Sequence, residues 1–590
     1  MKRILLVTAL IAGLTTAGTA SAATTYPNLA AAFDNVAVST ADSPATADID
    51  GSGHSFVAED LAAAGWRPGT TVTVGGTKLA LATTAPGTPD NVAANGQKIR
   101  LRGSGSALSF LVTSTGAATT GTGVIGYADG TTQNYELGAP DWFFGPTDTM
   151  ALAAPRWNTP TGPGAFSGKL YVVSVPLKTG GQVTSVTLPP IGSTGSMPRL
   201  HVFSLGFRPV SGPWTATWSA AIDDGLAPWP WTERTLRMVE HTSVGGPLTR
   251  IRLDNAFGPA PLTVGHATIA VRKSGETPVS TPVTLTFGGA RQVTMPAGGQ
   301  AMSDAVPFAV PADSDLLVSL YLPGTVQNAP MHNIASQDMY SSADGAGDHA
   351  ADGASFPTGN LFGFWTVLSG IDVVGAPSAG SVVAFGDSIT DGYLSSQNGN
   401  SRWPNFLARR LLARPRPAPG VVDEGISGNK VLSDAFTGLP GTGNAGISAQ
   451  ARVDRDLVSQ SGVRTAIVLE GINDINSGAS GDAVIAGLKQ LAQTIRAAHL
   501  RVIVGTLTPI KGCGCDSPDH SAARHQVNDF IRDNGGAFDA WVDFDAAIRD
   551  PADPDAMLPA YDSGDHLHPG DAGYQAMAGA IDLKQLQASW

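Results

Sequence analysis

The pattern of apolar and polar positions divides the chain into three parts, of which the first covers residues 23–210. Short runs at 71–74, 108–112 and 170–175 alternate apolar with polar residues and are separated by Gly, Pro, Asn and Asp. A period of two with turn residues between the runs is typical of strands in an all-β sandwich. Apart from a helical pattern at 58–64, helical signal is weak. We therefore predict a β-sandwich module.

The second part, residues 211–377, has the same kind of pattern. Its strand-like runs lie at 214–218, 236–239, 249–253, 283–287 and 316–322. Turn residues separate these runs as they do in the first part. We predict a second all-β domain, a sandwich of jelly-roll or similar type, that is accessory to the part that follows.

The pattern changes in the third part, residues 378–590. Short continuous apolar runs alternate there with longer helical patterns: strands at 381–385, 465–469 and 502–505, and helices at 403–412, 482–498 and 522–534. This alternation predicts a parallel sheet with helices on both faces. In such sheets the functional residues gather beyond the carboxyl ends of the strands. Ser388 lies just beyond the first of these strands.

The N-terminus has the features of a secretory signal peptide. Lys2 and Arg3 precede an apolar run at 4–14, and Ala-Ser-Ala at 20–22 is a small-residue cleavage pattern. No later run reaches the about 18 apolar residues that an anchor needs. We expect residues 1–22 to be removed after Ala22, leaving a secreted, extracellular protein without a stable membrane anchor.

Composition narrows the range of partners. The chain has 49 acidic and 36 basic residues, a formal net charge of −13, and 14% charged residues. This balance disfavours nucleic acid as a partner and offers no basic patch for anionic lipid. High Gly, Pro, Thr and Ala are typical of a β-rich extracellular protein with a neutral, polar surface. The oligomeric state is not indicated.

The two cysteines, Cys513 and Cys515, lie close together in the third part. In an exported protein they can form a disulfide that staples a surface loop, although the one-residue separation strains the usual geometry. Their spacing to His520 and His525 matches no common zinc pattern. Residues 48–53 have alternating oxygen ligands but lack the distal glutamate of a calcium loop, so we interpret them as a turn. We expect no metal and no organic cofactor.

Ser388 has two interpretations: the N-cap of a helix, or a nucleophile. A nucleophilic serine needs a base and an acid that orients the base. Asp565 and His568 are three residues apart, so in a helical turn both side chains face the same way. His566 points elsewhere on such a turn, and we therefore prefer His568 as the base.

Acyl transfer also needs hydrogen-bond donors for the developing oxyanion. Gly428 can offer a backbone N–H at close range, and Asn473, directly after a predicted strand, can offer a side-chain amide. With the Ser388 N–H these make three donors. We interpret Asp387 and Asp474 as turn and scaffold groups.

These residues together resemble a known family. Gly-Asp-Ser at 386–388, Gly428, Gly-Ile-Asn-Asp at 471–474 and the pair Asp565 and His568 are similar, in order, to the four signature blocks of the SGNH hydrolases, also called GDSL esterases and lipases. No Gly-x-Ser-x-Gly element is present, which argues against the ordinary α/β-hydrolase fold.

The resemblance implies a flavodoxin-like α/β/α three-layer fold for residues 378–590. It further implies that Ser388 is the nucleophile, that Asp565 and His568 complete the triad, and that Ser388, Gly428 and Asn473 form the oxyanion hole.

The β parts carry weaker resemblances. Residues 249–258 are similar to the β domain that precedes the catalytic domain in some secreted bacterial SGNH hydrolases, and residues 86–92 and 127–133 resemble β-sandwich modules of secreted actinobacterial glycosidases. The first part is therefore a candidate carbohydrate-binding module. The Trp-Pro-Trp run at 229–231 is the better candidate for an exposed aromatic patch, whereas Trp142, Phe143, Phe144 and Trp157 are interpreted as core.

These observations together predict a secreted serine esterase that hydrolyses carboxylic esters through an acyl-enzyme. The expected substrate is an acylated carbohydrate, with acetyl removed from a polysaccharide or other glycan. Two alternatives remain: a GDSL lipase or lysophospholipase acting on lipid esters, and a catalytically inactive glycan-binding or adhesion protein. The sequence does not decide between acyl groups or alcohols.

Overall fold

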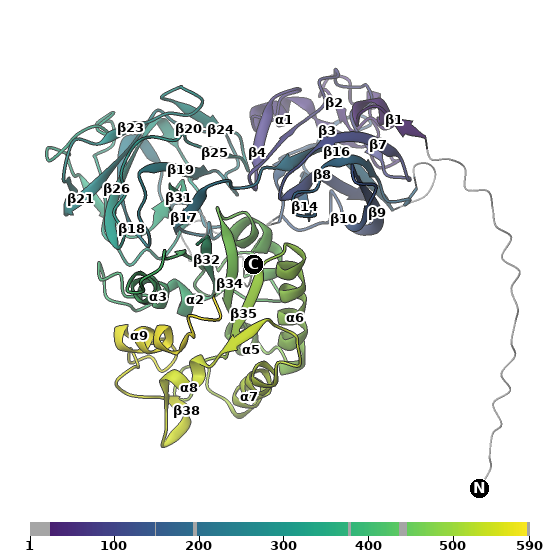
Figure 1. Ribbon diagram of the computed structural model, residues 1–590. Coiled ribbons are helices and arrows are strands. Elements are labelled where there is room, and N and C mark those ends of the chain that lie inside the picture. Colours follow the sequence, from purple (N-terminus) through teal and green to yellow (C-terminus); the bar gives the residue numbers. More distant parts are fainter. Residues whose placement is uncertain (1–23, 148, 193–197, 376–378, 436–444, 587–590) are drawn as a thin grey trace, which may run out of the picture.

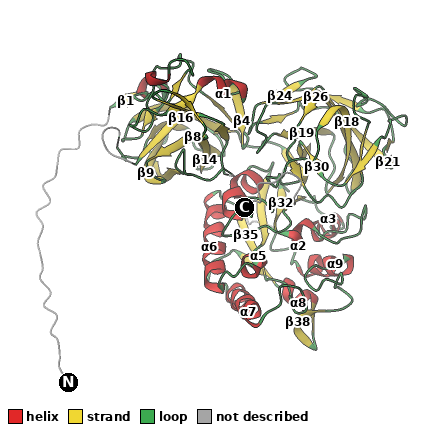
Figure 2. Ribbon diagram, turned by 180° about the vertical axis from the view of Figure 1, so that it is seen from behind, coloured by secondary structure: helices red, strands yellow, loops and turns green. Residues whose placement is uncertain are grey.

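The computed structural model describes residues 24–147, 149–192, 198–375, 379–435 and 445–586; the expected signal peptide, 1–22, lies outside them. Two strand-rich regions lie next to each other and adjoin a third region in which helices surround a sheet (Figures 1 and 2). We call them the first β region (24–210), the second β region (211–375) and the C-terminal region (379–586). The multidomain organisation predicted from the sequence is confirmed.

Two five-stranded sheets face each other across the core of the first β region. One has the order β1 (Thr25–Tyr26), β7 (Lys98–Gly103), β15 (Val183–Thr187), β9 (Thr119–Tyr127), β10 (Thr132–Ala139). The other has the order β11 (Leu152–Ala154), β14 (Gly168–Pro176), β8 (Ala107–Thr115), β16 (Arg199–Arg208), β6 (Val92–Ala93). Phe110, Ile125 and Tyr135 are buried between them. A smaller sheet contains β13 (Gly162–Gly164), β12 (Trp157–Thr159), β3 (Ser55–Val57) and β2 (Val38–Ser39).

The second β region is also a two-sheet sandwich. One sheet has the order β17 (Trp214–Ser219), β31 (Leu368–Val374), β19 (Leu248–Asp254), β25 (Gln300–Met302), β4 (Thr71–Val74), β5 (Thr77–Ala80). The other has the order β22 (Thr277–Pro278), β21 (His266–Ser274), β26 (Ser314–Val326), β18 (Trp231–Thr242), β28 (Met339–Ser341), β29 (Asn360–Phe362), with β23 (Val283–Leu285) beside β21. A short ladder joins β27 (Met331–His332) to β30 (Trp365–Thr366).

One strand predicted for the first part belongs to a sheet of the second. The hairpin of β4 and β5 pairs with β25 at Thr73 and Gln300, so it extends the sheet of the second β region. Gly75 and Gly76 form its turn with φ of 53° and 75°, the positive values that a tight two-residue hairpin requires. Next to it, helix α1 (Ala58–Ala63) lies where a helical pattern was predicted.

The C-terminal region has a parallel five-stranded sheet in the order β33 (Gly420–Gly425), β32 (Ser381–Gly386), β34 (Val463–Leu469), β35 (Arg501–Gly505), β36 (Ala540–Val542). In chain order this is 2-1-3-4-5, the flavodoxin-like arrangement. All six residues of β32 are buried, because helices cover both faces. The chain order reverses between β32 and β34, which is where such sheets carry their sites.

Helices flank this sheet on two sides. On one side lie α3 (Trp403–Leu412), α8 (Phe544–Ile548) and α9 (Asp571–Ala580), and on the other α6 (Gly481–Ala497) and α7 (Pro518–Asp533) (Figure 1). Helix α3 has the predicted bounds, α6 is shifted by one residue, and α7 begins four residues earlier than predicted, at a Ser517 cap. Within the described residues no helix is both long and apolar enough to cross a bilayer.

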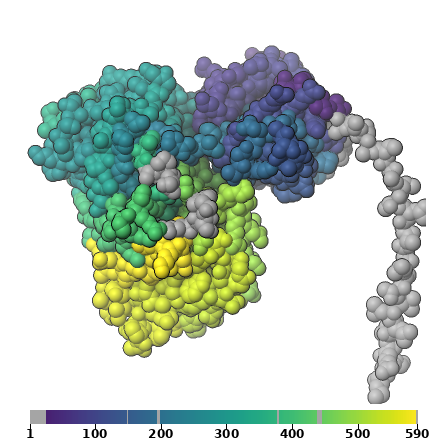
Figure 3. All heavy atoms as spheres, in the orientation of Figure 1, coloured from purple at the N-terminus to yellow at the C-terminus, as the bar shows by residue number. Residues whose placement is uncertain are grey.

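The three regions contact one another unequally. The second β region lies directly on the C-terminal region, whereas the first extends to the side (Figure 3). Between the second β region and the C-terminal region, the Ala216 N–H donates to the Ser461 carbonyl at 3.0 Å and the Val421 N–H to Ser243 Oγ at 2.9 Å, all four residues being buried. The first β region contacts the C-terminal region through an ion pair between Arg208 and Asp454.

Candidate active site

The strand-to-helix turn after β32 presents Ser388. Helix α2 (Ser388–Asp391) begins there, and its N-cap is Asp387, whose Oδ1 accepts the Ile389 N–H at 2.9 Å. Ser388 is therefore not the cap, and its hydroxyl is available to another partner. Gly386 makes this turn feasible, because a Cβ at that position would lie 2.5 Å from the Leu469 carbonyl oxygen.

Ser388, His568 and Asp565 form one hydrogen-bonded chain. Ser388 Oγ lies 2.8 Å from His568 Nε2, and His568 Nδ1 lies 2.6 Å from Asp565 Oδ2. Ser388 and His568 are buried, with 7% and 8% of their surface exposed. Because a carboxylate only accepts, Nδ1 carries the proton and Nε2 is free to accept from the serine hydroxyl. This is the arrangement in which an imidazole can remove a serine proton.

The loop that carries the histidine is not the helical turn expected from the spacing. Asp562 and Pro569 form an isolated antiparallel bridge, and between them Asp565 Oδ1 accepts the backbone N–H groups of Leu567 and His568 at 3.0 and 2.8 Å. The Asp565 carboxylate thus organises the loop. His568, the preferred candidate base, contacts Ser388 because of this loop and not because of helical periodicity. His566 instead contacts the Asp562 carboxylate through Nδ1 at 2.5 Å.

The electrostatics of the loop keep Asp565 ionised. Partial burial pushes its pKa up, but the hydrogen bonds from the backbone and ring of His568 and from the Leu567 N–H outweigh burial, so the pKa lies below its ordinary value. A carboxylate in this state can stabilise an imidazolium that forms on His568.

The structure brings the predicted oxyanion donors to the same sheet edge. Gly428 has φ of 84° in the turn after β33, and Asn473 lies in the first turn of α5 (Ile472–Asn476) after β34. Asn473 donates one amide hydrogen to the Asn429 carbonyl at 3.0 Å, which leaves the second for a ligand. Asp474 accepts the backbone N–H groups of Val431 and Leu432, as a scaffold group would. The two donor turns are thus fastened together.

Sequence reasoning missed Arg452, which ends α4 (Ala449–Arg452) and is fully buried. Its guanidinium lies over the Phe385 ring and donates to the Gly386 carbonyl at 2.9 Å and to Asn429 Oδ1 at 2.8 Å. It also pairs with Glu470 at 3.2 Å, directly before the Asn473 turn. One cation therefore joins the three segments that carry Ser388, Gly428 and Asn473. A single arginine in a helical run has no local signature, so no sequence signal pointed to it.

Asp387, which directly precedes Ser388, and Glu470 are two buried carboxyl groups of this site. Burial, reinforced by the neighbouring carboxylates, raises the pKa of both Asp387 and Glu470, and Arg452 offsets this only in part. Within the described residues, Asp387 Oδ2 and Glu470 Oε2 have no hydrogen-bond partner. Neither oxygen is therefore hydrogen-bonded to the Ser388 hydroxyl, and we assign these groups to the scaffold of the site.

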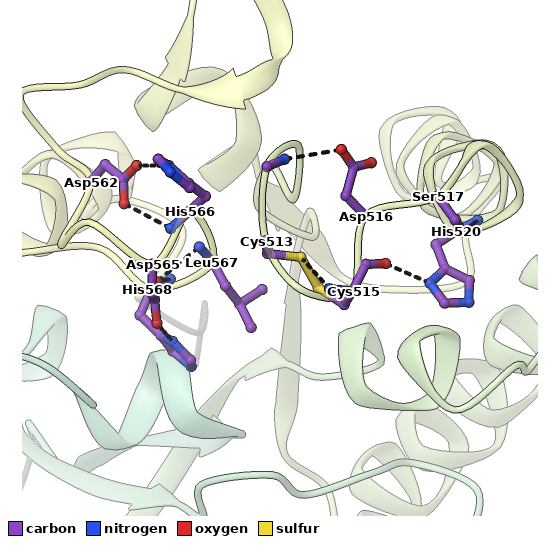
Figure 4. The surroundings of a disulfide bond; sticks show 11 residues. Cys513, Cys515, Asp516, Ser517, His520, Asp562, Asp565, His566, Leu567 and His568 are labelled. Atoms are coloured by element: carbon purple, nitrogen blue, oxygen red, sulfur yellow. Dashed lines mark hydrogen bonds and ion pairs between the residues drawn. A yellow bond between two sulfur atoms is a disulfide. The ribbon is translucent and has the colours of Figure 1, made fainter.

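Cys513 and Cys515 form a disulfide with a Cα–Cα distance of 5.1 Å. Figure 4 shows the disulfide facing Leu567, in the loop that carries Asp565 and His568. Cys513 is buried against Ile472 and Ile510, with Leu567 packed beside them. The interpretation as a surface staple is therefore incomplete: this apolar cluster links the histidine loop to the Asn473 turn.

Other candidate groups lie away from Ser388. Trp142 is buried in the core, as interpreted, whereas Phe144, also interpreted as core, is 86% exposed. Of the two tryptophans in the Trp-Pro-Trp run only Trp229 is partly exposed and Trp231 is buried, so the expected patch of two exposed tryptophans is corrected. Asp48 Oδ1 accepts the N–H groups of Gly51 and Gly53, as in a turn. Among the residues that the structure describes, no group of three or more His, Cys, Asp or Glu side chains is placed to hold a metal ion.

Comparison with known proteins places these features in a class. Residues 384–576 match the model of the GDSL-like Lipase/Acylhydrolase family, and residues 24–187 match the AziU2-like beta-sandwich domain. The chain thus carries a domain that matches the GDSL-like family model, a family whose members are hydrolases that act on esters, behind an N-terminal β-sandwich match. No curated protein matches the chain.

Solved structures similar to this chain include an acetylxylan esterase, Axe2, from Geobacillus stearothermophilus, with 22% identity, 36% of this chain and 96% of that chain covered, and a TM-score of 0.27. A putative lipolytic protein of the G-D-S-L family from Desulfitobacterium hafniense DCB-2 has 17% identity and a TM-score of 0.27, and the match covers 34% of this chain and 96% of that chain. A putative arylesterase from Agrobacterium tumefaciens str. C58 has 19% identity and a TM-score of 0.26, and the match covers 34% of this chain and 95% of that chain.

Proposed function

We propose that the C-terminal region hydrolyses carboxylic esters through an acyl-enzyme formed on Ser388. The observation that carries this proposal is the hydrogen-bonded chain from Ser388 Oγ through His568 to the Asp565 carboxylate. A serine hydroxyl is a weak nucleophile until a base removes its proton, and this chain supplies both the base and the group that orients it.

In the first step Ser388 Oγ attacks the ester carbonyl carbon while His568 Nε2 takes the hydroxyl proton. The carbonyl oxygen becomes an oxyanion, which the Ser388 N–H, the Gly428 N–H and the Asn473 amide stabilise. Collapse of this intermediate breaks the bond to the alcohol oxygen, which leaves with the proton from His568. Water then adds to the acyl group, gives its proton to His568, and the second collapse releases the acid and restores Ser388.

For the substrate we propose an acylated carbohydrate, with a short acyl group such as acetyl. Exposed groups in the histidine loop are polar: Ser563 is exposed, Asp565 has 37% of its side chain exposed and His566 has 52%. Such a rim suits an alcohol rich in hydroxyl groups. We also propose that the protein is exported through a signal peptide at 1–22, from the charge and apolar pattern described above.

The test compares acid release by the wild type and by Ser388→Ala from acetylated polysaccharides and from aryl esters of increasing chain length. We expect acetate release by the wild type and a loss of about 10⁴-fold to 10⁶-fold in kcat for the variant. Ser396→Ala, which changes an exposed serine on the following loop, is the matched control and should be fully active.

The outcomes separate the competing functions. A wild type that acts only on long-chain esters would indicate a lipid substrate instead of a carbohydrate. A folded wild type that neither releases acid nor reacts with an active-site fluorophosphonate at Ser388 would contradict ester hydrolysis and indicate a binding protein.

A further inference from the structure

A buried histidine of the second β region contacts the helix that begins with Ser388. His332, at the end of β27, has its Nε2 3.1 Å from Oδ1 of Asp391, the last residue of α2. Only 4% and 3% of the two side chains are exposed. The two residues are 59 positions apart and belong to different regions of the molecule. The second β region thus reaches the segment that carries the nucleophile.

The surroundings of His332 define its charge. Its Nδ1 lies 2.8 Å from the Ala221 carbonyl oxygen, and its Nε2 faces the Ile334 carbonyl oxygen as well as Asp391. Carbonyl and carboxylate oxygens only accept hydrogen bonds, so both ring nitrogens must donate. Both nitrogens therefore carry a proton, and the ring is an imidazolium paired with the Asp391 carboxylate.

Asp391 uses its second carboxylate oxygen on the other side of the active site. Oδ2 accepts the Ser427 hydroxyl at 2.6 Å and the Ser427 N–H at 3.2 Å. Ser427 directly precedes Gly428, whose N–H is a proposed oxyanion donor. One carboxylate therefore joins α2, which begins at Ser388, to the Gly428 turn.

The backbone around this carboxylate is held by the same interface. Arg402 Nε donates to the Asp391 carbonyl at 2.5 Å, and its Nη2 donates to the Ala335 carbonyl of the second β region at 2.7 Å. In α2 itself, the Gly392 N–H donates to the Ser388 carbonyl at 3.0 Å, so the turn is one helical turn long. Because Asp391 and Ser388 lie in the same helical turn, a displacement of Asp391 also moves Ser388.

We propose that His332 is a positioning residue for the reaction: by fixing the Asp391 carboxylate it sets the placement of Ser388 relative to the Gly428 N–H. This inference rests on the proposed ester hydrolysis at Ser388. Two oxyanion donors must be aimed at one atom, and misplacement by about 1 Å can lower a rate up to about 100-fold. A merely structural role would lower stability but leave kcat of the folded protein unchanged.

The ion pair predicts a pH dependence. Burial lowers the pKa of His332, but the attraction of Asp391, with that of Asp223, outweighs burial and raises the pKa to about 9. The stabilisation that this ion pair gives is fully present below the ordinary histidine pKa of about 6.5. It is lost as the pH rises through about 9, where His332 gives up its proton. Arg402 and Asp423 are further charged groups near this pair. Burial raises the pKa of Asp423 to about 7 and that of Asp223 to about 6. Both carboxyl groups are therefore ionised before His332 loses its proton.

The test uses the full chain with His332→Gln, which keeps a donor but removes the charge. We expect kcat to fall about 10-fold to 100-fold with KM nearly unchanged, and the rate of fluorophosphonate reaction at Ser388 to fall in parallel. The wild type should lose kcat as the pH rises through about 9, and the variant should lack this decline.

His266→Gln is the matched control. His266 is also buried, contacts the Asp348 carboxylate at 3.0 Å and lies on β21, away from the C-terminal region (Figure 1). It should lower the stability of the second β region without changing kcat or the pH profile. A His332→Gln protein as active as His266→Gln, with the wild-type pH profile, would overturn the inference.

Two further measurements keep the inference testable if His332→Gln does not fold. Ser427→Ala leaves the His332 and Asp391 pair intact and keeps the Ser427 N–H bond, but it removes the shorter hydrogen bond from the hydroxyl to Asp391. This weakens the link to the Gly428 turn and should lower kcat with KM nearly unchanged. The alkaline decline of the folded wild type needs no variant, and its absence would contradict the inference. A wild type without hydrolysis and without fluorophosphonate reaction would instead refute the proposed function.

Discussion

The first and second β regions are both strand-rich sandwiches, yet they engage the C-terminal region in different ways. The first meets it at the ion pair of Arg208 and Asp454, and Asp454 is 39% exposed at its side chain. The second meets it through buried groups, among them the Ser243 hydroxyl and the His332 imidazole. An ion pair with one partly exposed partner contributes little to stability, whereas the loss of a buried, hydrogen-bonded group destabilises the fold.

This difference shows that two domains of one class can have different roles beside the same site. The first β region docks mainly on the second: Trp66 Nε1 donates to the Ala297 carbonyl at 2.9 Å, and β4 pairs with β25. The second β region lies against the C-terminal region and contacts the helix that begins at Ser388. We therefore expect changes at the second interface to affect catalysis and changes at the first to leave it intact.

The largest effect should come from Arg250, at the interface of the second β region. Its Nε pairs with Asp372 at 2.9 Å, its Nη2 donates to Ser461 Oγ at 3.1 Å, and its guanidinium lies over Trp214. Arg250→Met keeps much of the packing but leaves the buried Asp372 without its cation. We expect a loss of about 3 kcal/mol in the free energy of unfolding, measured by urea denaturation.

Calorimetry of the same variant should show the transitions of the second β region and the C-terminal region shifting to lower temperature together. Arg100→Met, which changes an exposed arginine on β7 of the first β region, is the control and should shift neither. If the C-terminal transition of Arg250→Met stayed at its wild-type temperature, this would contradict a stabilising role of the second β region for the C-terminal region.

An intermediate effect is expected at the contact between the two β regions. Trp66→Phe removes the donor to the buried Ala297 carbonyl and should lower the free energy of unfolding of the first β region by about 1–3 kcal/mol. The kcat for ester hydrolysis should not change. Trp157→Phe is a suitable control, because its indole N–H has no partner among the described residues. A lower kcat in Trp66→Phe would mean that the first β region also acts on the site.

The smallest effect should come from Asp454→Asn, which breaks the ion pair of the first β region with the C-terminal region. Asp454 is partly exposed, and the buried Arg208 keeps its hydrogen bonds to the Gly75 carbonyl and to Ser174 Oγ. We therefore expect a loss of about 1 kcal/mol or less in the free energy of unfolding and an unchanged kcat. Thermal melts at low and high salt should differ less for the variant than for the wild type. Asp529→Asn, at an 80% exposed side chain, serves as the control. A fall in kcat would remove the distinction between the two interfaces.

Much of the fold could be predicted because the C-terminal strands and helices have strong local patterns. Helix α3 begins and ends at the predicted residues. Strand β33 was missed because Asp423 and Glu424 interrupt its apolar run; Glu424 is buried there because Gln460 donates to it at 2.6 Å. The hairpin of β4 and β5 was assigned to the first part because strand patterns carry no information about which sheet a strand joins.

The sequence by itself pointed to the candidate reacting groups, because Ser388, Asp565 and His568 lie in short segments whose residue types and order are informative, and the structure places the three side chains in one hydrogen-bonded chain. Tertiary structure alone decided how those groups are supported. Arg452 and His332 act across distances that no local pattern records, since a buried charge is defined by the partners that folding brings to it. The helical turn expected at His568 was wrong for the same reason: the Asp565 carboxylate, by accepting two backbone N–H groups, shapes a loop that periodicity does not describe.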